Sequence, residues 1–109
     1  MNMDPAGLKR MKTFTEVILR AKEAGSKPSF LRTPTEHGDN INVEAVIEGK
    51  RLNAGILFWD VSLLQEQGLV DTLDEEELAL GLNITDGMVD DAEKILSFVE
   101  TELKKFGAG

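Results

Sequence analysis

The sequence predicts an α+β fold, in which an antiparallel β-hairpin or a three-stranded meander is covered on one face by N-terminal and C-terminal helices. Apolar side chains recur every three or four residues near both ends of the chain, and they alternate with polar ones through residues 41–59. These are the spacings typical of helices and of strands. A chain of 109 residues, 41% of them hydrophobic, is long enough for one core. We therefore expect a single α+β domain over residues 1–109.

Capping boxes predict three helix starts, because a Ser or Thr and a Glu or Gln three residues later satisfy each other's backbone amides. They are Thr13 with Glu16, Ser62 with Gln65, and Thr72 with Glu75. The first opens a helix over residues 14–24, which ends at Gly25. Its apolar side chains share one face: Phe14, Val17, Ile18 and Ala21. The Asp-Pro pair at residues 4–5 is also a good helix start, so residues 1–12 either extend this helix or form a frayed tail.

Residues 26–40 are predicted to form a loop with at most a short strand at residues 29–33, because Pro, Gly, Ser and Thr are frequent in residues 26–40. A hairpin follows, in which residues 41–48 and 51–59 are joined by a type II′ turn at Gly49-Lys50. This register opposes Glu48 to Arg51, Ile47 to Leu52, Ala45 to Ala54, Val43 to Ile56 and Ile41 to Phe58. One face of the hairpin is then apolar throughout, as a face against a core must be.

Three helices are predicted after the hairpin. Two are short, over residues 63–67 and 73–80, and each ends at a glycine. The third runs from about residue 86 to 106 and is stopped by Gly107. Its apolar stripe consists of Met88, Ala92, Ile95, Leu96, Val99, Leu103 and Phe106. Acidic residues in its first turns and lysines in its last turn suit the helix dipole.

The charge of the chain is unevenly distributed. Residues 60–102 contain 13 Asp and Glu and one Lys, whereas the first 59 residues contain 7 acids and 9 bases, and the total is -8. Such a surface repels phosphate backbones and lipid headgroups and attracts basic surfaces. We therefore expect no nucleic-acid or membrane partner, and a protein partner with a basic surface. The alternative is that the charge serves solubility alone.

Several kinds of site find no support in the sequence. There is no cysteine, and no apolar run approaches the roughly 20 residues that cross a bilayer, so we expect a cytoplasmic protein. No glycine-rich phosphate loop is present, and we expect no cofactor. The acidic run cannot converge on one metal ion, because four consecutive side chains fan around a helix. This run consists of Asp74, Glu75, Glu76 and Glu77.

The outer face of the predicted hairpin carries three apolar residues among polar ones: Val46, Leu57 and Trp59. Either another segment covers them, or they mark a site for a partner or for self-association. Our leading hypothesis is a small acidic, non-enzymatic protein-binding domain of an inhibitor, chaperone or neutralising type. The acidic run, residues 74–77, would steer a basic partner, and the three apolar residues would bind it. We expect no catalytic residue and no metal.

Two alternatives come from other classes of protein. A small enzyme could be centred on His37, the only imidazole, with Ser29 or Thr35 as nucleophile and Asp39 as the residue that orients the base. A structural homo-oligomer could instead form through the hairpin. An isolated hairpin is marginal in water and has open edges, so we also expect a homodimer that buries Trp59.

Overall fold

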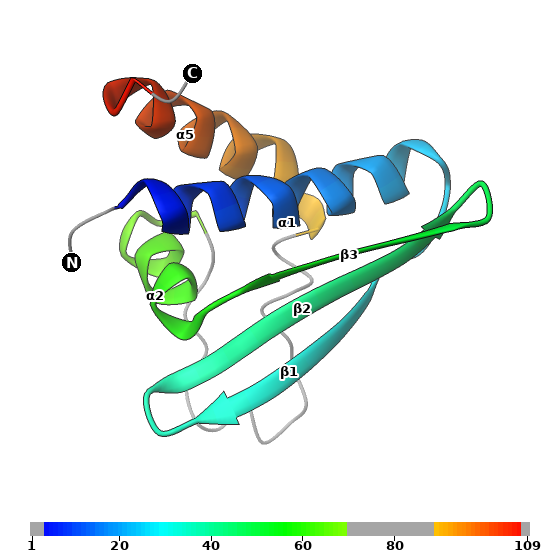
Figure 1. Cartoon of the computed structure of the whole chain (residues 1–109), viewed down its shortest axis with the longest axis horizontal. Helices are drawn as coiled ribbons and strands as arrows, with labels where there is room; N and C mark the ends of the chain where they lie inside the picture. The colour runs from blue at the N-terminus through cyan, green and yellow to red at the C-terminus, as the bar shows by residue number, and fades with distance from the viewer. Residues whose placement is uncertain (1–3, 70–88, 108–109) are drawn as a thin grey trace.

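The computed structural model describes residues 4–69 and 89–107 and confirms the α+β class (Figure 1). The elements are α1 (Pro5–Glu23), β1 (Ser29–Thr35), β2 (Gly38–Ile47), β3 (Lys50–Ile56), α2 (Phe58–Glu66) and α5 (Ala92–Lys105). The strands form an antiparallel sheet in the order β1-β2-β3. Helix α1 packs against β2 and β3, and α5 packs along α1, so the helices lie to one side of the sheet as predicted.

Helix α1 begins at Pro5 and therefore includes residues 5–12. The carboxylate of Asp4 caps it by accepting a hydrogen bond from the Gly7 amide at 2.6 Å. Pro5 is tolerated at the first helical position because a backbone N–H there would have no partner within the helix. Thr13 does not cap the helix. Its hydroxyl instead donates to the carbonyl of Lys9, one turn back. The extension predicted from Asp4 and Pro5 is thus present, and the start predicted at Thr13 is wrong.

The predicted helix ends are confirmed where the structure describes them. Gly25, Gly68 and Gly107 follow α1, α2 and α5, and each has a φ of 70°, which favours glycine. After α1, the amide of Ser26 donates to the carbonyl of Ala21 at 2.8 Å. This bond turns the chain sharply and directs it into β1.

The register between β2 and β3 differs from the predicted one by two residues. Ile47 pairs with Lys50, so the turn consists of Glu48 and Gly49, not of Gly49 and Lys50. Both turn residues have positive φ, 52° and 80°, as a type I′ turn requires. A shift of two residues keeps every side chain on its predicted face, because strand side chains alternate with a period of two. The shift also shortens β3, which ends at Ile56.

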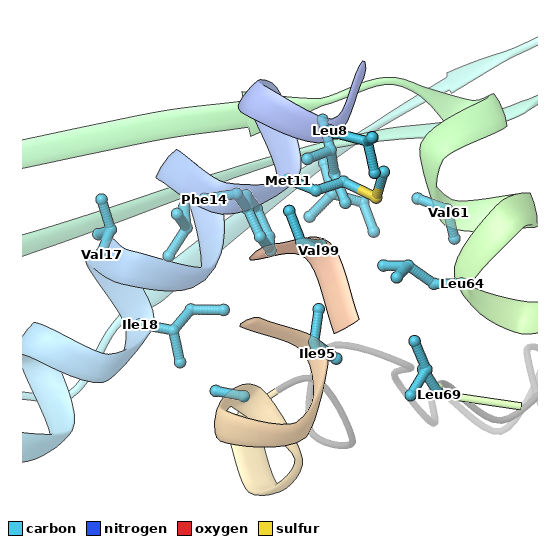
Figure 2. Close-up of a cluster of buried hydrophobic side chains, with 14 of the residues drawn as sticks. Leu8, Met11, Phe14, Val17, Ile18, Val61, Leu64, Leu69, Ile95 and Val99 are labelled. Atoms are coloured by element: carbon cyan, nitrogen blue, oxygen red, sulfur yellow. The ribbon is translucent and has the colours of Figure 1, made fainter. Parts of the chain in front are cut away.

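The core has two connected parts. Against the sheet, α1 covers the inner residues of β2 and β3, namely Ile41, Val43, Ala45 and Ile56. Figure 2 shows the second part, in which side chains of α1, α2 and α5 point toward one another. It contains Leu8, Met11, Phe14, Ile18, Val61, Leu64, Ile95 and Val99, all buried.

Helix α2 begins at Phe58, five residues before the predicted start at Leu63. The cause is Asp60, whose carboxylate accepts a hydrogen bond from the Leu57 amide at 2.9 Å and so satisfies the helix start. Ser62, predicted as a cap, lies inside the helix. The predicted helix over residues 73–80 lies outside the described residues. Helix α5 confirms the predicted C-terminal helix from Ala92 onward, but a turn at Asp91 separates it from the helical residues 89–90.

Candidate functional site

The structure does not bring the three predicted apolar contact residues together on one hairpin face. Val46 lies on the outer face of β2, close to the turn, and is 52% exposed. Leu57 is the N-cap residue of α2 and is partly buried, while Trp59 lies in the first turn of α2 and is 49% exposed. The acidic run, Asp74, Glu75, Glu76 and Glu77, lies outside the described residues.

Trp59 belongs instead to a row of three rings that we call the aromatic ladder. The imidazole of His37 stacks on the ring of Phe58, with centroids 5.2 Å apart and planes 28° apart. Phe58 in turn contacts Trp59, with centroids 4.6 Å apart and planes at 39°. Such offset and tilted pairs are favourable arrangements for aromatic rings. The ladder joins the β1–β2 turn to the start of α2.

Two residues of β2 hold Phe58 in place. The side-chain oxygen of Asn40 accepts a hydrogen bond from the backbone amide of Phe58 at 2.9 Å, which satisfies one of the unpaired amides at the start of α2. Gly38 lets Phe58 approach the strand, since a Cβ at this position would lie 3.3 Å from the Cβ of Phe58. The β1–β2 hairpin and α2 are therefore docked through the ladder.

An ion pair between a buried carboxylate and a partly exposed guanidinium fixes the start of α2 from the other side. Asp60 is 4% exposed and accepts bonds from Arg10 of α1 at 3.0 Å through Nε and at 3.3 Å through Nη2. The hydrogen bond from the Arg10 guanidinium to Asp60 raises the pKa of Arg10. Helix α2 is thus attached to α1 by the ion pair and to β2 by the hydrogen bond from Phe58 to Asn40. These contacts fix the helix turn that carries Phe58 and Trp59.

The residues proposed for catalysis are not arranged as a triad. Ser29 and His37 lie at opposite ends of the β1–β2 hairpin, because Ser29 pairs with Glu44 at the end far from the turn that contains His37. The Thr35 hydroxyl donates to the carbonyl of Gly38 at 2.6 Å and accepts from the amide of His37, so it is used within the turn. The imidazole of His37 is exposed and stacks on Phe58.

The structure places three adjoining hollows elsewhere, between α1 and β3. Neither His37 nor Trp59 lines any of these three. Within residues 4–69 and 89–107, no group of three or more acidic or histidine side chains is arranged to hold a metal ion. Within the same ranges, no helix is both long and apolar enough to cross a membrane.

A scan against models of known protein families and searches of curated proteins and of solved structures found no match to this chain. The function must therefore be argued from the surface itself. Sequence reasoning missed the aromatic ladder because it placed Phe58 and Trp59 in a strand, where neighbouring side chains point to opposite faces. The available signal was Asp60, at the third position of a helix starting with Phe58.

Proposed function

We propose that this protein is a non-enzymatic protein-binding domain that recognises a basic partner through the aromatic ladder of His37, Phe58 and Trp59. The observation that carries the proposal is the half-exposed Trp59, held at the end of a supported row of rings. Tryptophan is among the residues that most often dominate binding energy at protein interfaces. Contiguous apolar patches that a fold leaves exposed mark such sites.

The ladder suits binding because its rings are already ordered. Trp59 packs against Phe58, and Phe58 is fixed by the hydrogen bond to Asn40 and by the stacked His37. A partner therefore loses little binding energy to ordering these side chains, since that cost is met when the domain folds. The exposed part of Trp59 also offers both an apolar ring and an indole N–H to a partner.

A basic partner fits both the ladder and the charge of the chain. The ring faces of Trp and Phe attract Arg and Lys side chains, Arg more often than Lys. Glu36 lies in the β1–β2 turn beside His37 and is exposed. The net charge of -8 adds a long-range attraction toward a basic surface. We expect an Arg or Lys of the partner to stack on Trp59 at the centre of the interface.

The experiment compares immobilised wild-type protein with the Trp59→Ala and Leu31→Ala variants as bait in a lysate of the source cells. Leu31 is the matched control, because it is another apolar side chain, 66% exposed, on the distant outer face of β1. We expect basic proteins that bind the wild type and Leu31→Ala to be lost with Trp59→Ala. A bound protein is then purified and titrated against the wild type.

Trp59 is the only tryptophan in the chain, so with a tryptophan-free partner its fluorescence reports on this site alone. Removing a Trp from an interface centre typically weakens binding by 2 kcal/mol or more, so we expect at least about a thirtyfold rise in Kd for Trp59→Ala. A partner that binds Trp59→Ala and wild type equally would contradict the proposal, and so would a shared loss with Leu31→Ala.

A further inference from the structure

The two edges of the sheet are protected differently. Strand β1 contains Pro34, which has no N–H group and is placed opposite Asp39. A proline in an edge strand removes one ladder donor and so disfavours pairing of a further strand at that position. Strand β3 is the other edge of the sheet in the part of the chain that the structure describes, and its seven residues, Lys50–Ile56, include no proline. Only one of these two edges therefore carries a proline that disfavours pairing.

The register shows which backbone groups β3 presents at its open edge. Ile47 and Lys50 flank a two-residue turn, so they form a hydrogen-bonded pair. Bonded and non-bonded pairs alternate along an antiparallel ladder. The N–H and C=O groups of Arg51, Asn53 and Gly55 consequently point away from β2, toward the open edge. These three residues offer the donors and acceptors that an added strand needs.

A groove accompanies this edge on the helix side. It consists of the three adjoining hollows between α1 and β3. The middle hollow shares Thr13 with one neighbour and shares Arg20 and Leu52 with the other. The hollow nearest the start of α1 has a volume of about 480 Å³ and the one nearest its end about 410 Å³. Helix α1 runs along β3 in the opposite direction, as Figure 1 shows. The groove therefore follows the strand from one end to the other.

The charges in the groove differ between its ends. The end near the start of α1 is lined by two bases, Lys9 and Arg10, and by no acid. Arg10 is paired with Asp60, whereas the side chain of Lys9 is exposed to solvent. The opposite end is lined by both acids Glu23 and Glu48, beside two bases. A two-fold axis across the middle of β3 would bring the basic end of one copy against the acidic residues of the other.

We propose that a second copy of this chain pairs its β3 antiparallel with this edge, so that two three-stranded sheets become one six-stranded sheet. Asn53 is the midpoint of β3, so a two-fold axis at Asn53 pairs all seven residues of the strand. Arg51 then bonds with the partner subunit's Gly55, and Lys9 faces the partner subunit's Glu23. This interface does not involve the aromatic ladder, and the proposal is independent of the proposed function.

The position of α1 also fits this arrangement. Helix α1 packs on both β2 and β3, so its axis lies about one strand spacing, roughly 4.8 Å, from the two-fold axis. The two copies of α1 would therefore be about 10 Å apart. Packed helices are separated by about 8–10 Å.

Disulfide trapping tests the register directly, because the wild-type chain contains no cysteine. Opposed bonded residues have Cα atoms about 5.5 Å apart, within the range of about 4.4–6.8 Å that a disulfide spans. Under mild oxidation we expect most of the Asn53→Cys protein to become a covalent dimer in native buffer and to stay monomeric in urea. The control is Leu31→Cys, an exposed site on the other edge strand, which should remain monomeric. Equal cross-linking of both variants would overturn the proposal.

Sedimentation of the protein without introduced cysteines supplies the second test. We expect a wild-type dimer at tens of micromolar, which Trp59→Ser leaves intact. Reversing one charge, as Lys9→Glu or Glu23→Lys, should raise the dimer Kd about tenfold, and combining the two reversals should restore it because the pair is re-formed. A wild-type monomer at tens of micromolar, a dimer lost in Trp59→Ser, or a double variant no better than the single ones would overturn the proposal.

Discussion

Asp60 shows how one side chain connects two helices. Its buried carboxylate accepts two bonds from Arg10 on α1 and one from the amide of Leu57 at the start of α2. Burial makes a lone carboxylate costly, and these three donors offset that cost. Gly7 lies close to this carboxylate, and a Cβ at position 7 would be only 3.0 Å from the Oδ1 of Asp60. A small residue on α1 thus makes room for the ion pair that positions α2.

Replacing one member of this pair should be costly. We expect Arg10→Met to lower the free energy of unfolding by about 3 kcal/mol, because Asp60 would remain buried without its cation. Urea denaturation followed by circular dichroism measures this. Replacing Lys94, an exposed lysine of α5, with Met should change stability by less than about 0.5 kcal/mol. A similar loss in both variants would contradict the role of the pair.

The direction of the Arg10 pKa shift predicts how this loss depends on pH. Because Asp60 raises the pKa of Arg10, the stabilisation is fully present below the ordinary guanidinium pKa and is lost only as the pH rises through the higher folded value. The titration of Arg10 therefore leaves the stability difference between wild type and Arg10→Met constant between pH 6 and about 9.

At the scale of elements, the β2–β3 turn stands out because a glutamate adopts the left-handed conformation. Glu48 has a φ of 52°, which costs about 1 kcal/mol or more for a residue other than Gly, Asn or Asp. We expect Glu48→Asn to stabilise the protein by about 1 kcal/mol, because Asn-Gly is the preferred type I′ turn. Thermal unfolding measures the gain. Glu48→Gln removes the same charge without favouring this conformation, so an equal gain in that variant would show that charge is responsible.

The same turn explains which features the sequence could predict. The alternation of Ile41, Val43 and Ala45 identified the buried face correctly, because a register error of two residues leaves every face unchanged. The start of α2 could not be found from local pattern alone. It depends on Arg10, which is 50 residues away from Asp60 in the sequence, and on the bond from Phe58 to Asn40. The aromatic ladder follows from that start and was missed with it.

At the scale of the whole molecule, the charge is concentrated in one stretch of sequence. Residues 70–88 contain six acids and no base, and they include the run Asp74, Glu75, Glu76 and Glu77. Residues 4–69 contain equal numbers of acids and bases. The aromatic ladder and the β3 edge thus both belong to a part of the chain without net charge. The net charge of -8 attracts a basic partner at long range.

We therefore predict that salt changes the association rate with a basic partner more than the dissociation rate. The Debye length falls from about 10 Å at 0.1 M salt to about 3 Å at 1 M, which screens steering but not contact. Stopped-flow mixing measures both rates. Neutralising residues 74–77 should slow association and leave the circular dichroism spectrum unchanged, whereas His37→Ala should leave the association rate unchanged. An association rate independent of salt would rule out the steering role.

The position of α1 between α5 and the sheet also has a consequence for how the chain acquires its structure during synthesis. Helix α1 is synthesised before α5, which covers its second apolar face. At about 5–20 residues per second, the ribosome needs several seconds to make the chain between them. Throughout this interval Met11 and Ile18 lack the neighbours Ile95 and Val99 that surround them in Figure 2. A nascent chain therefore exposes this apolar face of α1 to chaperones that bind apolar helices until α5 has left the ribosome.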